Sequence, residues 1–182
     1  MNFAPFGVHI PDDCRPFAEI KEIGLTLYPG SNTFSNLKAV PEGVVNLTDD
    51  ILCFVDTALF SKVLPAAPSH IVLPPRMAAA RTVWEFSVTS FDDSVCPARV
   101  RAKVLSFEQL GEYTGFCRAQ WAILEALIAA TRFQWIPKTK ILESWPLWQE
   151  VVAKTGGGRE RKALRKLADY FVRQGVSISI DL

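Results

Sequence analysis

The chain has 182 residues, of which 49% are hydrophobic and 21% charged, with a formal net charge of +1. This length and composition fit one domain, or one domain with an appended subdomain, and exclude a disordered low-complexity chain. The near-neutral charge balance argues against a nucleic-acid binder driven by bulk charge.

Cysteine and histidine usage argues against a metal site and against secretion. The 4 cysteines are widely spaced without a C-x-x-C pair, and only 2 histidines are present. A reduced, cytoplasmic protein without a metal is therefore expected. Apolar runs such as residues 121–130 are too short to cross a bilayer, and Glu125 interrupts this one, so no membrane segment is expected.

The chain begins with a predicted strand over residues 2–10 that contains a Pro-Phe-Gly interruption. Hydrophobic residues then alternate with other residues over 23–28, which is typical of a half-buried strand. A Pro29-Gly30 turn follows, and a short helix is predicted from about Thr33.

The segment after this turn is a candidate phosphate site. Ser31, Asn32 and Thr33 place hydroxyl, amide and backbone N–H groups where the helix begins. The segment lacks the glycines and lysine of a P-loop and the Rossmann glycine pattern, so hydroxyls and amides would hold any phosphate. The alternative is that Ser31 or Asn32 only caps the helix.

Residues 44–47 are predicted to form a short apolar strand, and a helix capped by one of residues 48–50 is predicted to follow. The adjacent carboxylates Asp49 and Asp50 are interpreted as belonging to this cap rather than to a catalytic pair. Asn46 lies inside the strand, where its amide needs a partner that the edge of a ligand ring could supply.

A Pro- and Ala-rich connecting loop over residues 61–76 precedes a predicted β-hairpin. In the second strand of this hairpin, Arg99, Arg101 and Lys103 alternate with apolar residues. We interpret this row as a solvent-exposed face, and direct contact with an anionic ligand is the alternative.

The pattern becomes helical from Phe116. Arg118 lies near the start of this helix, where a cation is unfavourable unless an anion is nearby, so Arg118 is a candidate anion contact. Pro137 and Pro146 predict breaks that leave two short helices in the next segment.

A further helix is predicted over residues 159–174 after the glycine run 156–158, which is a weaker second candidate for anion binding. Residues 176–182 alternate between apolar and polar, which predicts a strand. That strand would close a barrel edge or cross to a second subunit.

Several segments occur in the order APFGV (residues 4–8), PGSNTFSNL (29–37), VVNLTDD (44–50), FCRAQWAILEALIAATR (116–132) and KTGGGRERKAL (154–164). Together they resemble the uncharacterised, flavin-reductase-like family of FMN-binding split-barrel proteins. The resemblance implies an α+β fold, a split β-barrel with an appended C-terminal helical subdomain. The expected domains are the FMN-binding core 1–110, the helical subdomain 111–175 and the C-terminal strand 176–182.

The resemblance also implies FMN as cofactor and a homodimer. In the family, the APxGV strand lies along the flavin ring, and Phe6 stands where relatives often carry methionine. The residues expected to bind FMN are Pro5, Phe6, Gly7, Val8, Ser31, Asn32, Thr33, Asn36, Asn46 and Arg118.

The expected function is that of an FMN-binding flavoprotein, an oxidoreductase whose substrate the sequence does not identify. Relatives are linked to tetrahydromethanopterin-dependent one-carbon metabolism, and a nicotinamide or another small molecule would stack on the exposed flavin face. No residue is specific enough to be nominated as catalytic. The alternative is a non-catalytic ligand-binding or assembly protein that uses the dimer pocket, and neither interpretation expects a nucleic-acid or membrane partner.

Overall fold

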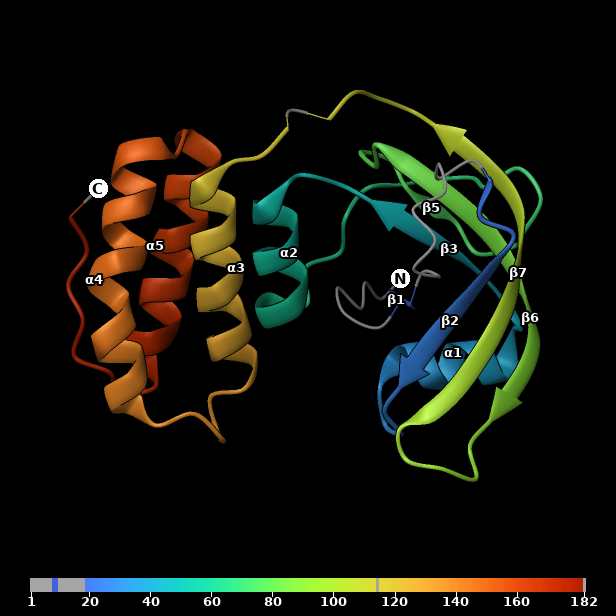
Figure 1. Cartoon of the computed structure of the whole chain (residues 1–182), viewed down its shortest axis with the longest axis horizontal. Helices are drawn as coiled ribbons and strands as arrows, with labels where there is room; N and C mark the ends of the chain where they lie inside the picture. Colours follow the sequence, from blue (N-terminus) through green and yellow to red (C-terminus); the bar gives the residue numbers. More distant parts are fainter. Residues whose placement is uncertain (1–7, 10–18, 114, 182) are drawn as a thin grey trace. The chain divides into compact units, whose positions relative to one another are not determined.

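The structure, a computed structural model, describes residues 8–9, 19–113 and 115–181 (Figure 1). Its strands are β1 (Val8–His9), β2 (Glu22–Leu27), β3 (Glu42–Leu47), β4 (Ala66–Ala67), β5 (Arg76–Met77), β6 (Thr82–Asp92) and β7 (Ala98–Gln109). Its helices are α1 (Asn32–Ala39), α2 (Ile51–Phe60), α3 (Arg118–Thr131), α4 (Lys138–Thr155) and α5 (Gly158–Arg173). They form two compact units, the first made of Met1–Asp49 and Val63–Tyr113 and the second of Asp50–Lys62 and Thr114–Leu182.

The first unit is built on an antiparallel sheet with the strand order β1-β2-β7-β6-β3. The long β6–β7 hairpin is strongly curled (Figure 1). Register shifts between Glu85 and Phe86 and between Val88 and Ser90 interrupt this hairpin, and such bulges bend a strand and increase its twist. The sheet is a half-barrel, and the predicted α+β split-barrel fold with a C-terminal helical part is confirmed.

One face of the half-barrel carries the hydrophobic core of the first unit. Successive side chains of a strand point to opposite faces, so every second residue of β2 and β7 reaches this core. Helix α1 packs on it through Leu37 and Phe34. The buried members are Ile20, Ile23, Leu25, Leu27, Leu37, Trp84, Phe86, Val100 and Ala102. Burial of each large member stabilises the fold by about 1.5–3 kcal/mol.

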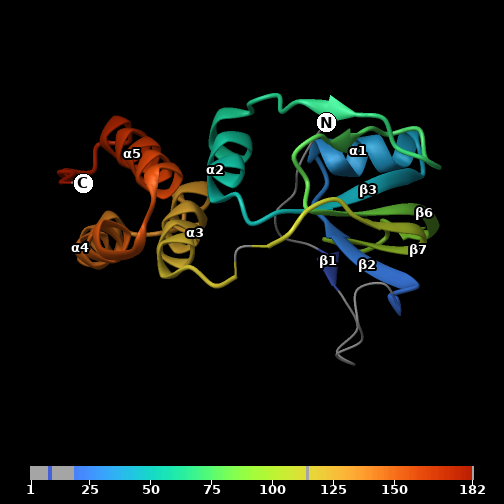
Figure 2. The same cartoon turned by 90° about the horizontal axis from the view of Figure 1, so that it is seen from above.

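The second unit is a helical bundle formed by α2, α3, α4 and α5 (Figure 2). Helix α3 contributes a row of buried alanines, which lets neighbouring helices approach closely. Larger side chains fill the remaining space, among them Ile123, Leu127, Leu164, Leu167 and Phe171. Helix α2 packs on α5 and α3, and its Asp56, only 3% exposed, forms ion pairs with Lys62 and Lys166.

The predicted break at Pro146 is wrong, because α4 continues through this residue as one helix. Proline cannot donate the helical hydrogen bond, which usually costs about 3 kcal/mol. The neighbouring tryptophans offset this loss, since Trp145 and Trp148 are buried and Trp145 makes edge-to-face contacts with Trp148 and Phe171. Packing of the aromatic face therefore outweighs the local preference of proline.

Residues 176–181 form no strand, in contrast to the prediction. Val176 is buried, Ile178 and Ile180 pack against the helical core, and Trp145 Nε1 donates a 2.8 Å hydrogen bond to the carbonyl of Ser179. The alternating pattern thus reflects an extended segment with one apolar side lying on the bundle.

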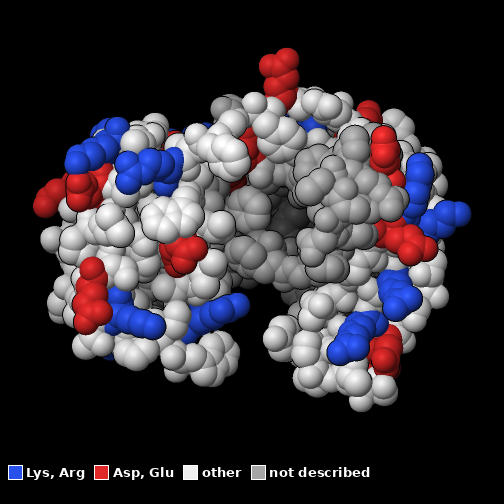
Figure 3. Space-filling model, in the orientation of Figure 1, with Lys and Arg blue, Asp and Glu red and all other residues white. Residues whose placement is uncertain are grey.

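Basic and acidic side chains are interspersed over the described surface of each unit in the view of Figure 3. Among the described residues, no helix is both long enough and apolar enough to span a bilayer.

Gly43 of β3 lies opposite Phe86 of β6, and a Cβ at Gly43 would meet Phe86 Cζ at 2.4 Å. Because the Phe86 ring is buried, Gly43→Ala should lower the free energy of unfolding by about 1–3 kcal/mol. Chemical denaturation followed by circular dichroism measures this change. Gly158→Ala is the control, since a Cβ there meets nothing within 4 Å. The added Phe86→Leu change should relieve the clash, and equal losses in both backgrounds would contradict the explanation.

Candidate functional site

The start of α1 is shaped by a tight turn at the end of β2. Gly30 has φ +88°, and the N–H of Ser31 donates a 3.1 Å hydrogen bond to the carbonyl of Tyr28. This arrangement is typical of a type II turn, which places proline second and glycine third. Ser31 then caps the helix, because its hydroxyl oxygen accepts a 3.2 Å hydrogen bond from the N–H of Phe34.

The cap leaves donors available at the end of the helix. In the part of the chain that the structure describes, the N–H groups of Asn32 and Thr33 have no partner. No acidic residue lies in the first turn, so the positive end of the helix is not neutralised locally. Asn36 is exposed one turn later, and Thr33 is half-buried. Ser31, Asn32, Thr33 and Asn36 therefore lie together at or near one anion-attracting helix end, as a phosphate site requires.

The predicted N-terminal strand contains four further residues that are expected to contact FMN. Pro5, Phe6 and Gly7 lie outside the described residues. The backbone of Val8 pairs with Leu25 in β2, the strand that leads to the turn before α1.

Asn46 already has partners within the protein. Its Oδ1 accepts a 2.8 Å hydrogen bond from the N–H of Met77, and its Nδ2 donates to the carbonyl of Val44 at 3.2 Å. The argument that a ligand must satisfy this amide therefore no longer applies. A contact from Asn46 to the flavin stays a prediction without that support.

Arg118 belongs to the second unit, where it is exposed at the start of α3. Cys117, the residue before it, provides no side-chain cap. Its charge already acts on a carboxylate of the same unit, because Lys154 and, to a smaller extent, Arg118 lower the pKa of Glu150. An anion contact from Arg118 to a ligand stays a prediction.

The glycine run before α5 is occupied by the protein's own carboxylate. Glu160 Oε2 accepts a 3.0 Å hydrogen bond from the N–H of Gly157, and its Oε1 lies 3.5 Å from Gln120 Nε2. Since Glu160 takes the place that an anion would need, this second candidate site loses its basis.

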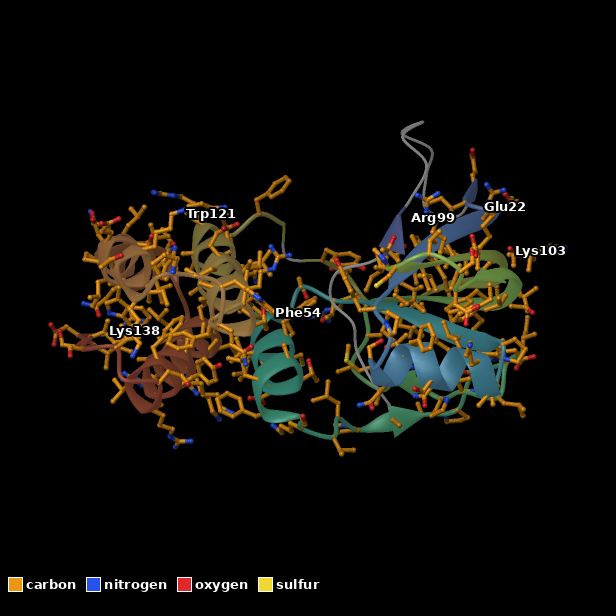
Figure 4. All side chains as sticks on the ribbon, turned by 90° about the horizontal axis from the view of Figure 1, so that it is seen from below. Glu22, Phe54, Arg99, Lys103, Trp121 and Lys138 are labelled. Carbon is orange, nitrogen blue, oxygen red and sulfur yellow. The ribbon has the colours of Figure 1, made fainter. Side chains whose placement is uncertain are left out.

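The basic row of β7 lies on an exposed face of the sheet. Arg99 is in register with Asp92, and Lys103 with Glu22. Figure 4 shows Glu22, Arg99 and Lys103 extending outward from the first unit. The interpretation of this row as a solvent-exposed face agrees with the exposure of Arg99, Arg101 and Lys103.

The acidic pair after β3 serves structure. Asp50 caps α2, because its Oδ1 accepts a 3.1 Å hydrogen bond from the N–H of Leu52. Its carboxylate also pairs with Arg159 and accepts a 3.0 Å hydrogen bond from the Cys53 thiol. Asp49 forms an ion pair with Arg81 at 3.2 Å. The interpretation of these residues as a cap is confirmed for Asp50.

A buried carboxylate on β6 is the feature that the sequence did not reveal. Glu85 is 1% exposed and accepts hydrogen bonds from the N–H groups of His70, Ile71 and Val72 at 2.7, 2.6 and 3.0 Å. Burial raises the pKa of Glu85, but these hydrogen bonds outweigh it and hold the pKa below its ordinary value. Glu85 alternates with Trp84 and Phe86 along the strand, and this alternation by itself carries no sign of the buried carboxylate.

The acidic side chains described above do not form a metal centre. In the described ranges, no group of three or more His, Cys, Asp or Glu side chains is arranged to hold a metal ion.

Comparisons with known proteins agree with this fold. A family model for the N-terminal domain of a protein of unknown function (DUF447) matches residues 1–110, and a second DUF447 model matches residues 117–169. An FMN-bound protein from Methanosarcina mazei, itself assigned to DUF447, is 20% identical with a TM-score of 0.64, and the match covers 82% of this chain and 80% of that one. At this identity the match shows a shared fold.

Two further structures are more distant. An FMN-binding protein from Thermus thermophilus is 12% identical with a TM-score of 0.41, covering 49% of this chain and 55% of that one. The 2-nitrobenzoate 2-nitroreductase of Pseudomonas fluorescens is 15% identical with a TM-score of 0.44, covering 56% and 53%. A comparison with proteins of curated function found no match.

Glu85→Gln should lower the free energy of unfolding by about 2–3 kcal/mol at neutral pH, because the neutral amide accepts weaker hydrogen bonds. The depressed pKa of Glu85 means that the carboxylate stabilises the fold above its ordinary value of 4.5 and that this contribution is lost as the pH falls through the folded-state pKa. Chemical denaturation from pH 3 to 8 should show a difference in the free energy of unfolding between the natural protein and Glu85→Gln. This difference should be constant above about pH 6 and become smaller below pH 4.5. Glu22→Gln, on the exposed face, is the control, and a pH-independent Glu85 difference would contradict this role.

Burial, together with the hydrogen bond to Asp50, raises the pKa of Cys53 to about 12. Its thiol should therefore react with iodoacetamide at pH 8 on the order of 100-fold more slowly than the exposed Cys96. Peptide mass spectrometry of timed samples separates the two sites. Asp50→Asn should accelerate labelling of Cys53 and leave Cys96 unchanged, whereas equal rates in the natural protein would contradict the assignment.

Proposed function

The chain belongs to the family described as protein of unknown function (DUF447). Because its motifs also resemble those of flavin-reductase-like proteins, we propose that it is an FMN-binding flavoprotein. The observation that carries this proposal is the start of α1. There, the N–H groups of Asn32 and Thr33 have no partner among the described residues, and no acidic side chain lies in the first turn.

These residues fit the phosphate of FMN. Helix N–H groups and hydroxyls bind phosphate well, and the helix dipole favours its negative charge. In this assignment Asn32 and Thr33 donate backbone N–H groups, the Thr33 hydroxyl adds a third donor, and the Ser31 cap keeps the helix end in place. Asn36 adds a side-chain amide one turn further along.

When bound, FMN would supply hydride or electron transfer, and the protein would supply position and exclusion of water. The lack of a nominated acid or base in the sequence is consistent with chemistry carried by the cofactor. We propose an oxidoreductase acting on a small molecule, with a pterin in one-carbon metabolism as the substrate class to examine first. We also propose a homodimer, which light scattering at micromolar concentrations tests.

Comparing FMN with riboflavin tests the phosphate assignment, because riboflavin has no phosphate. Ser31→Ala/Thr33→Ala should weaken FMN binding at least tenfold and leave riboflavin binding unchanged, as measured by quenching of flavin fluorescence. Ser35→Ala is the matched control, since its exposed hydroxyl lies in the same helix and, among the described residues, donates to the carbonyl of Ser31 alone.

Loss of the Ser31 cap also lowers helix stability by about 1 kcal/mol, so thermal unfolding is followed alongside binding. Absence of any flavin binding by the natural protein would reject the flavoprotein and favour a non-catalytic ligand-binding or assembly role. Equal weakening of FMN and riboflavin would instead reject the phosphate assignment.

A further inference from the structure

Arg76 is a half-buried cation on the short strand β5. This strand lies beside β3 (Figure 1), and it pairs with β4 through Ala67 opposite Arg76. The next residue, Met77, is buried and donates its N–H to Asn46 Oδ1 at 2.8 Å. The side chain of Arg76 thus emerges from a backbone that is fixed against both neighbouring strands.

The guanidinium of Arg76 has no partner among the residues that the structure describes. Its Nε is buried without a hydrogen bond, and no described residue forms an ion pair or hydrogen bond with the rest of the group. Arg81 and Arg159, by comparison, each pair with an aspartate. Buried polar groups are nearly always hydrogen-bonded, and a partly buried charge without a partner is unfavourable.

The two carboxylates that hold this segment, those of Glu85 and Glu42, are engaged with backbone N–H groups. Glu85 accepts the N–H groups of residues 70–72, and Glu42 accepts that of Leu73 at 3.2 Å. Glu108 Oε2 lies 3.2 Å from His70 Nε2, which is an ion pair only when the imidazole is protonated, and this oxygen is buried without a hydrogen-bond partner among the described residues. Glu85 and Glu42 are therefore engaged elsewhere, and no acid among the described residues, Glu108 included, forms an ion pair with Arg76. A bound anion would supply the compensating negative charge.

The backbone near Arg76 is also restrained. Pro74 and Pro75 precede it with fixed φ angles, and the N–H of Ala78 donates to the carbonyl of Pro65 at 2.9 Å. The Ser69 hydroxyl donates to the carbonyl of Pro74. Because the segment is restrained on both sides, the buried Nε is kept in place rather than released into solvent.

We propose that Arg76 forms an anion-binding site that takes a phosphate or carboxylate group of a small-molecule ligand. A guanidinium offers paired donors that match two oxygens of either group, and partial burial strengthens such a contact. Two ligands could supply such an anionic group, namely FMN through its phosphate, or a second small molecule. Only the identification of the ligand as FMN rests on the proposed function.

Inorganic phosphate is the first probe, titrated by isothermal calorimetry into the flavin-free protein at constant ionic strength. The natural protein should bind it, Arg76→Gln should weaken binding at least tenfold, and Arg76→Lys should fall between them. Arg101→Gln is the matched control, because Arg101 is an exposed arginine of the same unit. Equal binding by Arg76→Gln, or no binding by the natural protein, would overturn the site.

Thermal unfolding provides a second measurement that does not depend on calorimetry. Phosphate should raise the Tm of the natural protein and of Arg101→Gln, but not that of Arg76→Gln. Without phosphate, Arg76→Gln should unfold at the same temperature as the natural protein or higher, because it removes a half-buried charge whose buried Nε has no partner among the described residues. A clear loss of Tm in that condition would identify an internal partner and overturn the proposal.

Flavins then distinguish the two sources. If Arg76→Gln weakens binding of FMN but not of riboflavin, the flavin phosphate occupies the Arg76 site and not the start of α1. If it weakens neither flavin while phosphate binding is lost, the Arg76 site serves a second ligand. A natural protein that binds phosphate through Arg76 but binds no flavin would retain the site and reject the proposed function.

Discussion

The carboxylate of Glu85 is the interaction on which the arrangement of the first unit depends. It replaces solvent for consecutive backbone N–H groups of a segment that has little regular structure of its own. Glu42 and Asn46 extend this support along β3, at Leu73 and Met77. The connecting loop is thus fixed to the sheet by side chains of the sheet.

This support explains both what the sequence predicts and what it does not. The alternating apolar residues of β2 and β7 and the helical spacing in α2, α3 and α5 depend on local periodicity, so their type follows from sequence. The burial of Glu85 depends on hydrogen bonds to a loop that lies more than ten residues earlier in the chain and whose conformation the sequence does not predict. An alternating strand normally predicts a solvent-facing carboxylate at this position, and only the tertiary structure reveals that residues 70–72 cover it.

The same distinction applies to the candidate site. Ser31 as a cap and the donors after it follow from local turn chemistry, which short sequences specify well. Asn46 was singled out correctly as an amide that needs partners, but these are backbone groups of the protein, the nearby Val44 and Met77, which is 31 positions away. The predicted helix break at Pro146 and the predicted C-terminal strand were wrong for a similar reason. Contacts with Trp145, Trp148 and Phe171 decide the conformation of these segments. Arg76, inside a proline-rich loop, carried no signal, because the absence of a partner is visible only in three dimensions.

The second unit is assembled from two separate parts of the chain, since α2 lies between the two parts of the first unit while α3, α4 and α5 follow both. Ile51, Leu52 and Val55 of α2 belong to the same core as residues made much later. During synthesis at about 5–20 residues per second, this apolar face has to wait several seconds for its partners. The newly made chain therefore passes through a stage in which an uncovered amphipathic helix is exposed, and protection by a chaperone would matter most at that stage.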